Sequence, residues 1–279
     1  MEELKNIPME KYLELPGISN SDLKHLKKSL AHYLHYKSIP PEERKTTPAQ
    51  ALGKSAHTLL FEPDKFEKEF VITPSDNWTF KENKIVRKSA EEQGKTAIKP
   101  SDVEDMKAMV EAVKAHPTAG ELIDLESDHE VERAVKFPYS PDGTEAEFEC
   151  KIRYDYINHG KRYFLDLKTI EDASTYNKII NAIMNYEYYR QLTLYSIGAR
   201  VEFGKIYRGV LIFVEKKAPY GIKVFELDDN LFLYAVKEID TLLKTLAEYE
   251  QDKEMWTGYP LEIETAYLPN YLQGEIDYV

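Results

Sequence analysis

The stretch Tyr163–Ile170, "YFLDLKTI", decides how the rest of the chain is interpreted. Its apolar beginning predicts a buried strand. The strand then carries two opposite charges, Asp166 and Lys168, at positions where a buried strand ordinarily stays apolar. Such a pair indicates either a salt bridge or a catalytic or metal-binding site, and the neighbouring residues are needed to distinguish these alternatives.

The preceding residues indicate that this strand is one half of a hairpin. They alternate as a strand does, and "NHGK" at 158–161 is a turn signal. If these four residues close a tight hairpin, Asp155 faces Phe164 and Arg153 faces Asp166. Asp155 and Asp166 then lie on one face of the hairpin as diagonal neighbours.

This arrangement suits a bound cation. Diagonal neighbours have Cα atoms roughly 7–8 Å apart, too far for direct contact but close enough for two carboxylates to share one Mg²⁺. Lys168, on the same face, would position or deprotonate a water, or stabilise negative charge on a phosphate. The alternative is a surface salt-bridge ladder in which Arg153 pairs with Asp166, and the pattern alone leaves both open.

The remaining elements predict strands in the middle of the chain with helices on either side, an α/β or α+β layout. Ser19 or Ser21 is expected to cap the first helix. The segment 40–48 is expected to be a loop, and the polar, weakly patterned segment 74–99 a mobile loop. Helices are predicted over 18–37, 49–62, 101–116, 172–185, 187–204 and 229–252, and strands over 130–137, 146–157, 161–168, 207–215 and 222–227.

Composition limits the class of protein. The chain has 279 residues, of which 42% are apolar and 31% charged, as in a soluble globular protein with a real core. No apolar run approaches the roughly 20 residues that span a bilayer, and the first residues are too charged for a signal peptide. We therefore expect no membrane association and an intracellular location. Cys150 is the only cysteine, which excludes a disulfide and a cysteine-ligated cluster.

The net charge of −12 argues against a protein that coats itself in nucleic acid. It does not exclude a nuclease, because such an enzyme can line one channel with lysine and arginine and remain acidic elsewhere.

Six motifs in order, from Ile18 to Ser196, resemble those of a known family. The pair "RYDYI" and "LDLKT" resembles the signature of the PD-(D/E)XK nuclease superfamily, and the full series resembles RecE-type exonucleases of phages and prophages. Lambda exonuclease and the RecB nuclease domain are more distant relatives. The motifs are "ISNSDLKHLKKSLAHY", "LGKSAHTLLFEP", "VERAVKF", "FECKIRYD", "FLDLKT" and "YYRQLTLYS".

The resemblance implies a PD-(D/E)XK nuclease core, a central mixed β-sheet flanked by helices. It implies one domain over residues 1–279, with a helical part at about 1–125, the catalytic sheet at about 126–230 and a closing helix at about 229–252. The chain departs from the family at Tyr154, where a proline is usual, and at Phe137, where a tryptophan is usual. Neither change removes a ligand.

The resemblance also implies the metal ligands. Asp155, Asp166, the Leu167 carbonyl and His57 would hold Mg²⁺, for which Mn²⁺ would substitute, and Lys168 would be the catalytic lysine. Without the family, His57 would be interpreted as a core histidine.

Four further residues are assigned less directly. Glu132 matches the family's strand glutamate, although Glu130 on the same face leaves this position open. Gln191 and Tyr195 share a helix face and are expected to contact substrate or orient the site. Arg153 is expected to contact phosphate or to pair with Asp166.

The function implied is a Mg²⁺-dependent exonuclease that degrades double-stranded DNA from its ends, 5′ to 3′, in phage or prophage recombination. A ring-shaped homo-oligomer, a single-strand annealing protein as partner and the cytoplasm of a bacterial host follow from the same resemblance. Two alternatives stay open: a nuclease for single-stranded or branched DNA, and a non-catalytic recombination accessory protein.

Overall fold

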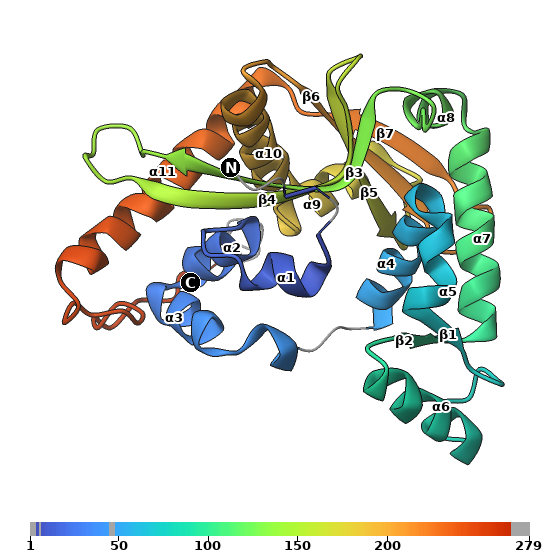
Figure 1. The fold of residues 1–279 in the computed structure, drawn as a ribbon. Coiled ribbons are helices and arrows are strands. Elements are labelled where there is room, and N and C mark those ends of the chain that lie inside the picture. The colour runs from blue at the N-terminus through green and yellow to red at the C-terminus, as the bar shows by residue number, and fades with distance from the viewer. Residues whose placement is uncertain (1–3, 6, 45–47, 269–279) are drawn as a thin grey trace, which may run out of the picture.

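The centre of the structure is a five-stranded mixed sheet (Figure 1). This computed structural model describes residues 4–5, 7–44 and 48–268. The strands, in sheet order, are β3 His129–Tyr139, β4 Phe148–Asn158, β5 Tyr163–Ile170, β6 Arg208–Glu215 and β7 Ile222–Glu226. Neighbouring strands are antiparallel except for β5 and β6, which are parallel. The predicted central mixed sheet flanked by helices is confirmed.

Helices cover both faces of the sheet (Figure 1). The crossover between the parallel strands β5 and β6 is made by α9 and α10, as a parallel connection requires. None of the helices in the described ranges is long and apolar enough to cross a membrane. The helices are α1 Met9–Glu14, α2 Asn20–Lys28, α3 Leu30–Ser38, α4 Pro48–Phe61, α5 Phe66–Glu69, α6 Lys81–Glu92, α7 Pro100–Ala115, α8 Pro117–Leu122, α9 Tyr176–Asn185, α10 Tyr188–Phe203 and α11 Asp229–Gln251, with 3-10 turns at Pro41–Glu43 and Pro63–Lys65.

The sheet separates two apolar cores. On one face, Phe164 of β5 packs in a core with Leu192 of α10 and Leu243 of α11. On the other face, Leu165 of β5 packs in a core with Met106 of α7 and residues of α4. Because successive residues of β5 enter different cores, the strand is buried on both sides. A polar side chain on either face of this strand therefore has apolar neighbours that hold it in place.

The single helix predicted over 18–37 is wrong, because the chain forms α2 and α3 with a break between them. Ser29 adopts an extended backbone (φ −177°, ψ 162°), and its hydroxyl accepts the His32 backbone N–H at 3.2 Å. Because Ser29 has an extended backbone and its side chain caps α3, α2 ends at the residue before it. The predicted cap at Ser19 is confirmed, since its hydroxyl accepts the Asp22 N–H at 3.3 Å.

The loop predicted over 74–99 is also wrong, because this segment contains α6 and strand β2. Its order depends on Asn83, which is fully buried. The Asn83 side-chain amide donates to the carbonyl oxygens of Ser75 at 2.8 Å and Asn77 at 2.7 Å. A buried asparagine leaves no periodic apolar signal in the sequence. The strands β1 Phe70–Ile72 and β2 Thr96–Ile98 pair in parallel as a separate two-stranded sheet.

The hairpin between β4 and β5 has a longer loop than the tight turn predicted. Asn158 pairs with Tyr163, and Tyr156 pairs with Leu165, so four residues lie outside the ladder. The Asn158 side-chain oxygen accepts the Lys161 N–H at 2.7 Å, and Arg162 takes a left-handed conformation (φ 55°). An asparagine-stabilised loop of this kind shifts the register by two residues.

The corrected register changes which residues face one another. Continued by one residue beyond the Tyr156 and Leu165 pair, it sets Asp155 opposite Asp166. In the tight hairpin predicted from the sequence, Arg153 faces Asp166, and Asp155 and Asp166 are only diagonal neighbours. The structure therefore brings the two acids closer than the sequence predicted.

A second irregularity lies in β3 beside Asp155. Glu132 has a left-handed backbone (φ 58°) and falls between the paired residues Val131 and Arg133, opposite Asp155. Val131 packs toward the α4 and α7 core, whereas Val135 belongs to the α10 core. The side chains of β3 thus change from one core to the other across Glu132, beside the carboxylate pair.

Candidate active site

The two predicted aspartates and the lysine lie together where α4 contacts β4 and β5. The Asp166 side chain is only 1% exposed, and its carboxyl group is within hydrogen-bonding reach of Asp155. Lys168 Nζ lies 2.9 Å from Asp166 Oδ2. The structure therefore joins the three residues that the sequence predicted to share a face.

His57 of α4 completes this cluster. Its Nε2 lies 3.4 Å from Asp155 Oδ1, and its Nδ1 lies 3.5 Å from Glu132 Oε1. The ring is held at 4.9 Å from Phe61, one turn further along α4. Helix α4 thus places His57 beside Asp155 of β4 and Glu132 of β3. A histidine that only packed in the apolar core would not need these contacts.

The strand glutamate beside the cluster is Glu132. It forms an ion pair with Arg153 and contacts His57. Glu130 instead lies 3.2 Å from the Nε2 atom of His159 and 3.5 Å from Nε of Arg133. The left-handed backbone of Glu132 turns its side chain toward the cluster.

Arg153 does not pair with Asp166. Its ion-pair partner is Glu132, and its side chain is 12% exposed. The salt-bridge ladder between Arg153 and Asp166 is therefore wrong, because Arg153 pairs with Glu132 and Asp166 pairs with Lys168.

The environment shifts the pKa values of the two aspartates in opposite directions. Burial raises the pKa of Asp166 to about 7, opposed by Lys168 and reinforced by the charge of Asp155. Burial also acts to raise the pKa of Asp155, but His57 and Lys168 outweigh it and hold that pKa well below its ordinary range. Burial acts to lower the pKa of Lys168, while the two carboxylates raise it above its ordinary value. The cluster thus concentrates negative charge that nearby cations only partly offset.

Several buried polar atoms of the cluster lack a hydrogen-bond partner. Both carboxylate oxygens of Asp166, Nε2 of His57 and Nε of Arg153 are in this state. Asp166 Oδ2 is close to Lys168, yet the contact lacks hydrogen-bond geometry. Buried polar atoms are ordinarily satisfied, so a group of unsatisfied atoms at one place needs an explanation.

The residue types of the cluster suit a divalent cation. Two carboxylates and an imidazole are suitable donors for such an ion. In the part of the chain that the structure describes, no three such side chains are already gathered as a metal site. His57 and Asp166 are instead engaged with Asp155 and Lys168, so a bound cation would replace these contacts. The chemistry of the donor set therefore fits a divalent metal ion.

The predicted pair on α10 lies near the cluster. The side-chain amide of Gln191 donates to the Tyr195 hydroxyl at 3.2 Å, which confirms that the two share a helix face. Tyr195 is mostly buried, with its ring 5.2 Å from that of Tyr154. Burial raises the pKa of Tyr195, and the charges of Asp155 and Asp166 add to this effect. Tyr195 is thus part of the core that supports the site.

Two hollows flank the cluster. One, of about 450 Å³, is lined by His57, Glu132, Arg153 and Asp155. The other, of about 890 Å³, is lined by Lys168. Leu167 lines both, and its side chain packs against the α4 and α7 core. The cluster is therefore bordered by two hollows.

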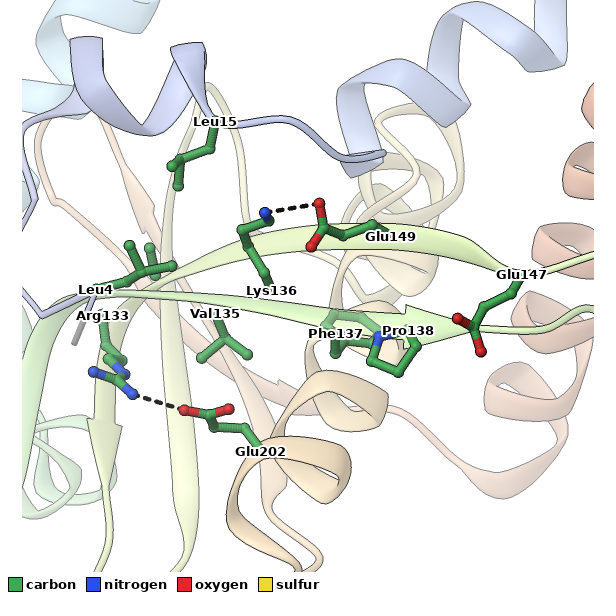
Figure 2. A pocket seen from close by; sticks show the side chains of 11 residues that line it. Leu4, Leu15, Arg133, Val135, Lys136, Phe137, Pro138, Glu147, Glu149 and Glu202 are labelled. Carbon is green, nitrogen blue, oxygen red and sulfur yellow. Dashed lines mark hydrogen bonds and ion pairs between the residues drawn. The ribbon is translucent and has the colours of Figure 1, made fainter. Parts of the chain in front are cut away.

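A third hollow lies elsewhere and does not belong to the site. It has a volume of about 440 Å³ and lies beside β3, where Arg133 pairs with Glu202 and Lys136 pairs with Glu149 (Figure 2). None of the predicted metal ligands lines it.

One neighbour of Lys168 was not predicted from the sequence. Lys168 Nζ lies 4.7 Å from the centre of the Tyr188 ring, a cation–π contact. The clustered tyrosines of "NYEYYRQ" were a signal for it, because consecutive aromatic residues at a helix start seldom all enter a core.

Comparison with known proteins agrees with this geometry. A family model described as a PDDEXK-like domain of unknown function (DUF3799) matches residues 19–259. No curated protein matches the chain.

Among solved structures, the chain is similar to one from Eubacterium rectale described as a candidate exonuclease. The two share 11% sequence identity, with a TM-score of 0.64, over 97% of this chain and 99% of that one. At this identity the similarity shows a common fold. A second structure, of SSO0001, has 14% identity over 72% of this chain and 88% of that one, and its TM-score of 0.31 is too low to carry an argument.

Proposed function

This chain belongs to the family of PDDEXK-like domains of unknown function, and we propose that it is a metal-dependent deoxyribonuclease that degrades linear DNA from its ends. One observation carries the proposal. Asp166 is a buried carboxylate whose Oδ1 has no partner and whose Oδ2 has only the ion pair with Lys168, and it lies between Asp155, which lines one hollow, and Lys168, which lines the other. The ion pair with Lys168 leaves Oδ1 available, as a site that binds a cation requires.

The proposed ligands of the cation are Asp155, Asp166, His57 and the carbonyl oxygen of Leu167, and the proposed ion is Mg²⁺, with Mn²⁺ as a substitute. When bound, such an ion polarises a phosphodiester and lowers the pKa of a bound water.

The other side chains have roles that follow from their contacts. Lys168 holds its proton, since the carboxylates raise its pKa, and its ammonium group can donate to a phosphate oxygen as negative charge develops. Arg153 brings a second positive charge to the smaller hollow. Glu132 contacts both Arg153 and His57, and so orients a proposed ligand and a proposed phosphate contact.

The finer parts of the proposal rest on the resemblance to RecE-type exonucleases. They are 5′ to 3′ polarity on double-stranded DNA, a role in phage or prophage recombination, a ring-shaped homo-oligomer and an annealing protein as partner. Each can fail without affecting the proposal of a nuclease.

Digestion of end-labelled DNA tests the proposed function. Linear duplexes labelled at the 5′ or the 3′ end, and a closed circle of the same sequence, are incubated with wild-type protein and Mg²⁺. We expect the linear DNA to be degraded, the circle to remain intact, and Lys168→Ala to lose the activity. Lys253→Ala, an exposed lysine paired with Glu250 outside both hollows, is the control. If wild type and Lys168→Ala digest DNA equally, the proposal is wrong.

A further inference from the structure

The larger hollow beside Lys168 has features that the proposed chemistry does not use. It lies between the ends of β5 and α9 and is lined by five lysines, Lys24, Lys54, Lys168, Lys178 and Lys216. Two acidic residues also line it, of which Asp172 pairs with Lys178 and Glu171 with Lys216, so the lining keeps an excess of positive charge. Within the described ranges Lys24 has no carboxylate partner, and its Nζ lies 6.0 Å from the ring of Tyr186. A lysine-lined hollow at a phosphodiester site suits a polyanionic strand.

Tyr186, in the lining of this hollow, is 55% exposed although it is a large aromatic residue. Its ring stacks on that of Tyr188, with centroids 5.6 Å apart and planes 30° from parallel. Tyr188 in turn lies beneath Lys168 Nζ at 4.7 Å. A continuous aromatic surface thus runs from the catalytic lysine to an exposed ring.

The backbone that presents Tyr186 is held in an uncommon conformation. Glu187, the next residue, is left-handed (φ 62°) and forms the bend between α9 and α10. Its buried carboxylate accepts a 2.6 Å hydrogen bond from Arg190, whose side chain is fully buried. Arg190 also bonds Glu238 at 2.9 Å and Asn20 at 3.0 Å. A non-glycine left-handed residue persists only where its surroundings hold it, so the orientation of Tyr186 is a fixed feature.

From these contacts we infer that Tyr186 is the residue on which a nucleobase of the cleaved strand stacks, next to the phosphate at Lys168. A positively charged groove with an exposed aromatic ring is the combination that binds single-stranded nucleic acid. A base inside a duplex is already stacked on both faces, so neither face is available to Tyr186. The hollow therefore takes a single-stranded or frayed end. This inference rests on the proposed function and adds to it the form of the substrate.

Two kinds of measurement test it. The first is kcat/KM for a short single strand, either intact or with an abasic nucleotide at one of its first three positions, for wild type, Tyr186→Ala and Tyr186→Phe. The second is the fluorescence of 2-aminopurine at those positions with EDTA present, which reports stacking without cleavage. Tyr176→Ala is the matched control, because Tyr176 begins α9, the helix that Tyr186 follows, is 66% exposed and does not line the hollow.

We expect Tyr186→Ala to lower kcat/KM on the intact strand by about tenfold or more, the range for loss of one base stack. Tyr186→Phe and Tyr176→Ala stay near wild type. An abasic nucleotide at the stacked position lowers the wild-type value similarly and lowers that of Tyr186→Ala no further. Stacking at that position quenches 2-aminopurine in wild type and not in Tyr186→Ala.

The inference is overturned if Tyr186→Ala cleaves and quenches like wild type, or if the effects of Tyr186→Ala and the abasic nucleotide multiply. If wild type cleaves no DNA, the proposed function fails. The quenching measurement then still decides whether Tyr186 binds a base.

Discussion

Two networks of buried charge in this protein differ in how completely they are satisfied. In the network around Arg190, each guanidinium nitrogen has a partner: Nε bonds Asn20, Nη1 bonds Glu238 and Nη2 bonds Glu187. Lys27 adds a 2.7 Å ion pair to Glu238. This network joins α2, α10 and α11 and lies beside the sheet rather than within it.

The network around Asp166 is incomplete. Asp166 has two unsatisfied oxygens, and His57 and Arg153 each have an unsatisfied nitrogen. Glu132, which contacts both His57 and Arg153, has a strained left-handed backbone. This network adjoins both hollows, whereas Asn20 is the one member named above of the Arg190 network that lines either of them.

The difference indicates two purposes for buried charge. A complete network stabilises one arrangement of the chain, and removing one member leaves its partners buried and uncompensated. An incomplete network reserves polar atoms for something that is not part of the chain. Substitutions in the first should therefore affect folding, and substitutions in the second should affect binding and cleavage.

The largest effect is expected for Asp166→Asn. The substitution keeps the shape of the side chain and removes the charge that the proposed cation requires, so cleavage of linear DNA should fall by at least about 100-fold. The melting temperature should change little, because loss of the ion pair with Lys168 is offset by relief of the repulsion between the Asp155 and Asp166 carboxylates. Initial cleavage rates and thermal unfolding of the same preparations check both points. A variant that retains most of the wild-type rate would contradict the comparison.

A substitution in the complete network should act on stability instead. Arg190→Ala leaves Glu187 and Glu238 buried without their main partner, and should lower the free energy of unfolding by about 3–5 kcal/mol. Urea unfolding measures this change. Arg200→Ala, on the exposed side of the same helix, is the control and should change stability by no more than about 0.5 kcal/mol. Equal effects of the two variants would show that the Arg190 network does not stabilise the fold.

The two glutamates of β3, Glu130 and Glu132, provide a matched pair of variants, and the effect expected at Glu132 is of intermediate size. Glu132→Gln weakens contacts to Arg153 and His57, and should lower the cleavage rate by about tenfold or more. Glu130→Gln changes contacts to His159 and Arg133, away from the site, and should leave the rate near wild type. The reverse order of the two rates would mean that Glu130 is the functional residue.

The smallest effect concerns Lys151, which donates to the carbonyl oxygens of Tyr12, Leu13 and Leu15 at the end of α1. Burial lowers the pKa of Lys151 to about 8. Between pH 8 and its ordinary pKa, the unfolded chain then holds more protons than the folded one, so this residue makes stability rise with pH. The stability of wild type relative to Lys151→Met should increase by about 1 kcal/mol from pH 8 to 9.5. Chemical unfolding at the two pH values measures it, and a constant difference would contradict the shift.

The sequence predicted the strands, most of the helices and the identity of the clustered residues, because these depend on local periodicity and residue type. It mispredicted the hairpin register, since nothing in "NHGK" shows that Arg162 becomes left-handed and lengthens the loop. It could not choose between Glu130 and Glu132, because the left-handed backbone of Glu132 breaks the alternation on which that choice depends.

Arg190 was missed for a different reason. Its partners Asn20 and Glu238 lie far from it in the sequence, on α2 and α11, so no local pattern connects them. The segment 74–99 was mispredicted in the same way, because its order depends on the polar contacts of Asn83. Contacts between distant polar residues are what the sequence alone did not reveal.

The central claim is that the unsatisfied atoms around Asp166 belong to a metal site, and titration with Mn²⁺ tests it most directly. Calorimetry or the Mn²⁺ electron paramagnetic resonance signal, measured without DNA, should show binding to wild type and to Arg200→Ala. Binding should be lost in Asp166→Asn and weakened in His57→Ala. If wild type binds no Mn²⁺, or if Asp166→Asn binds it as tightly as wild type, the incomplete network is not a metal site and the account is wrong.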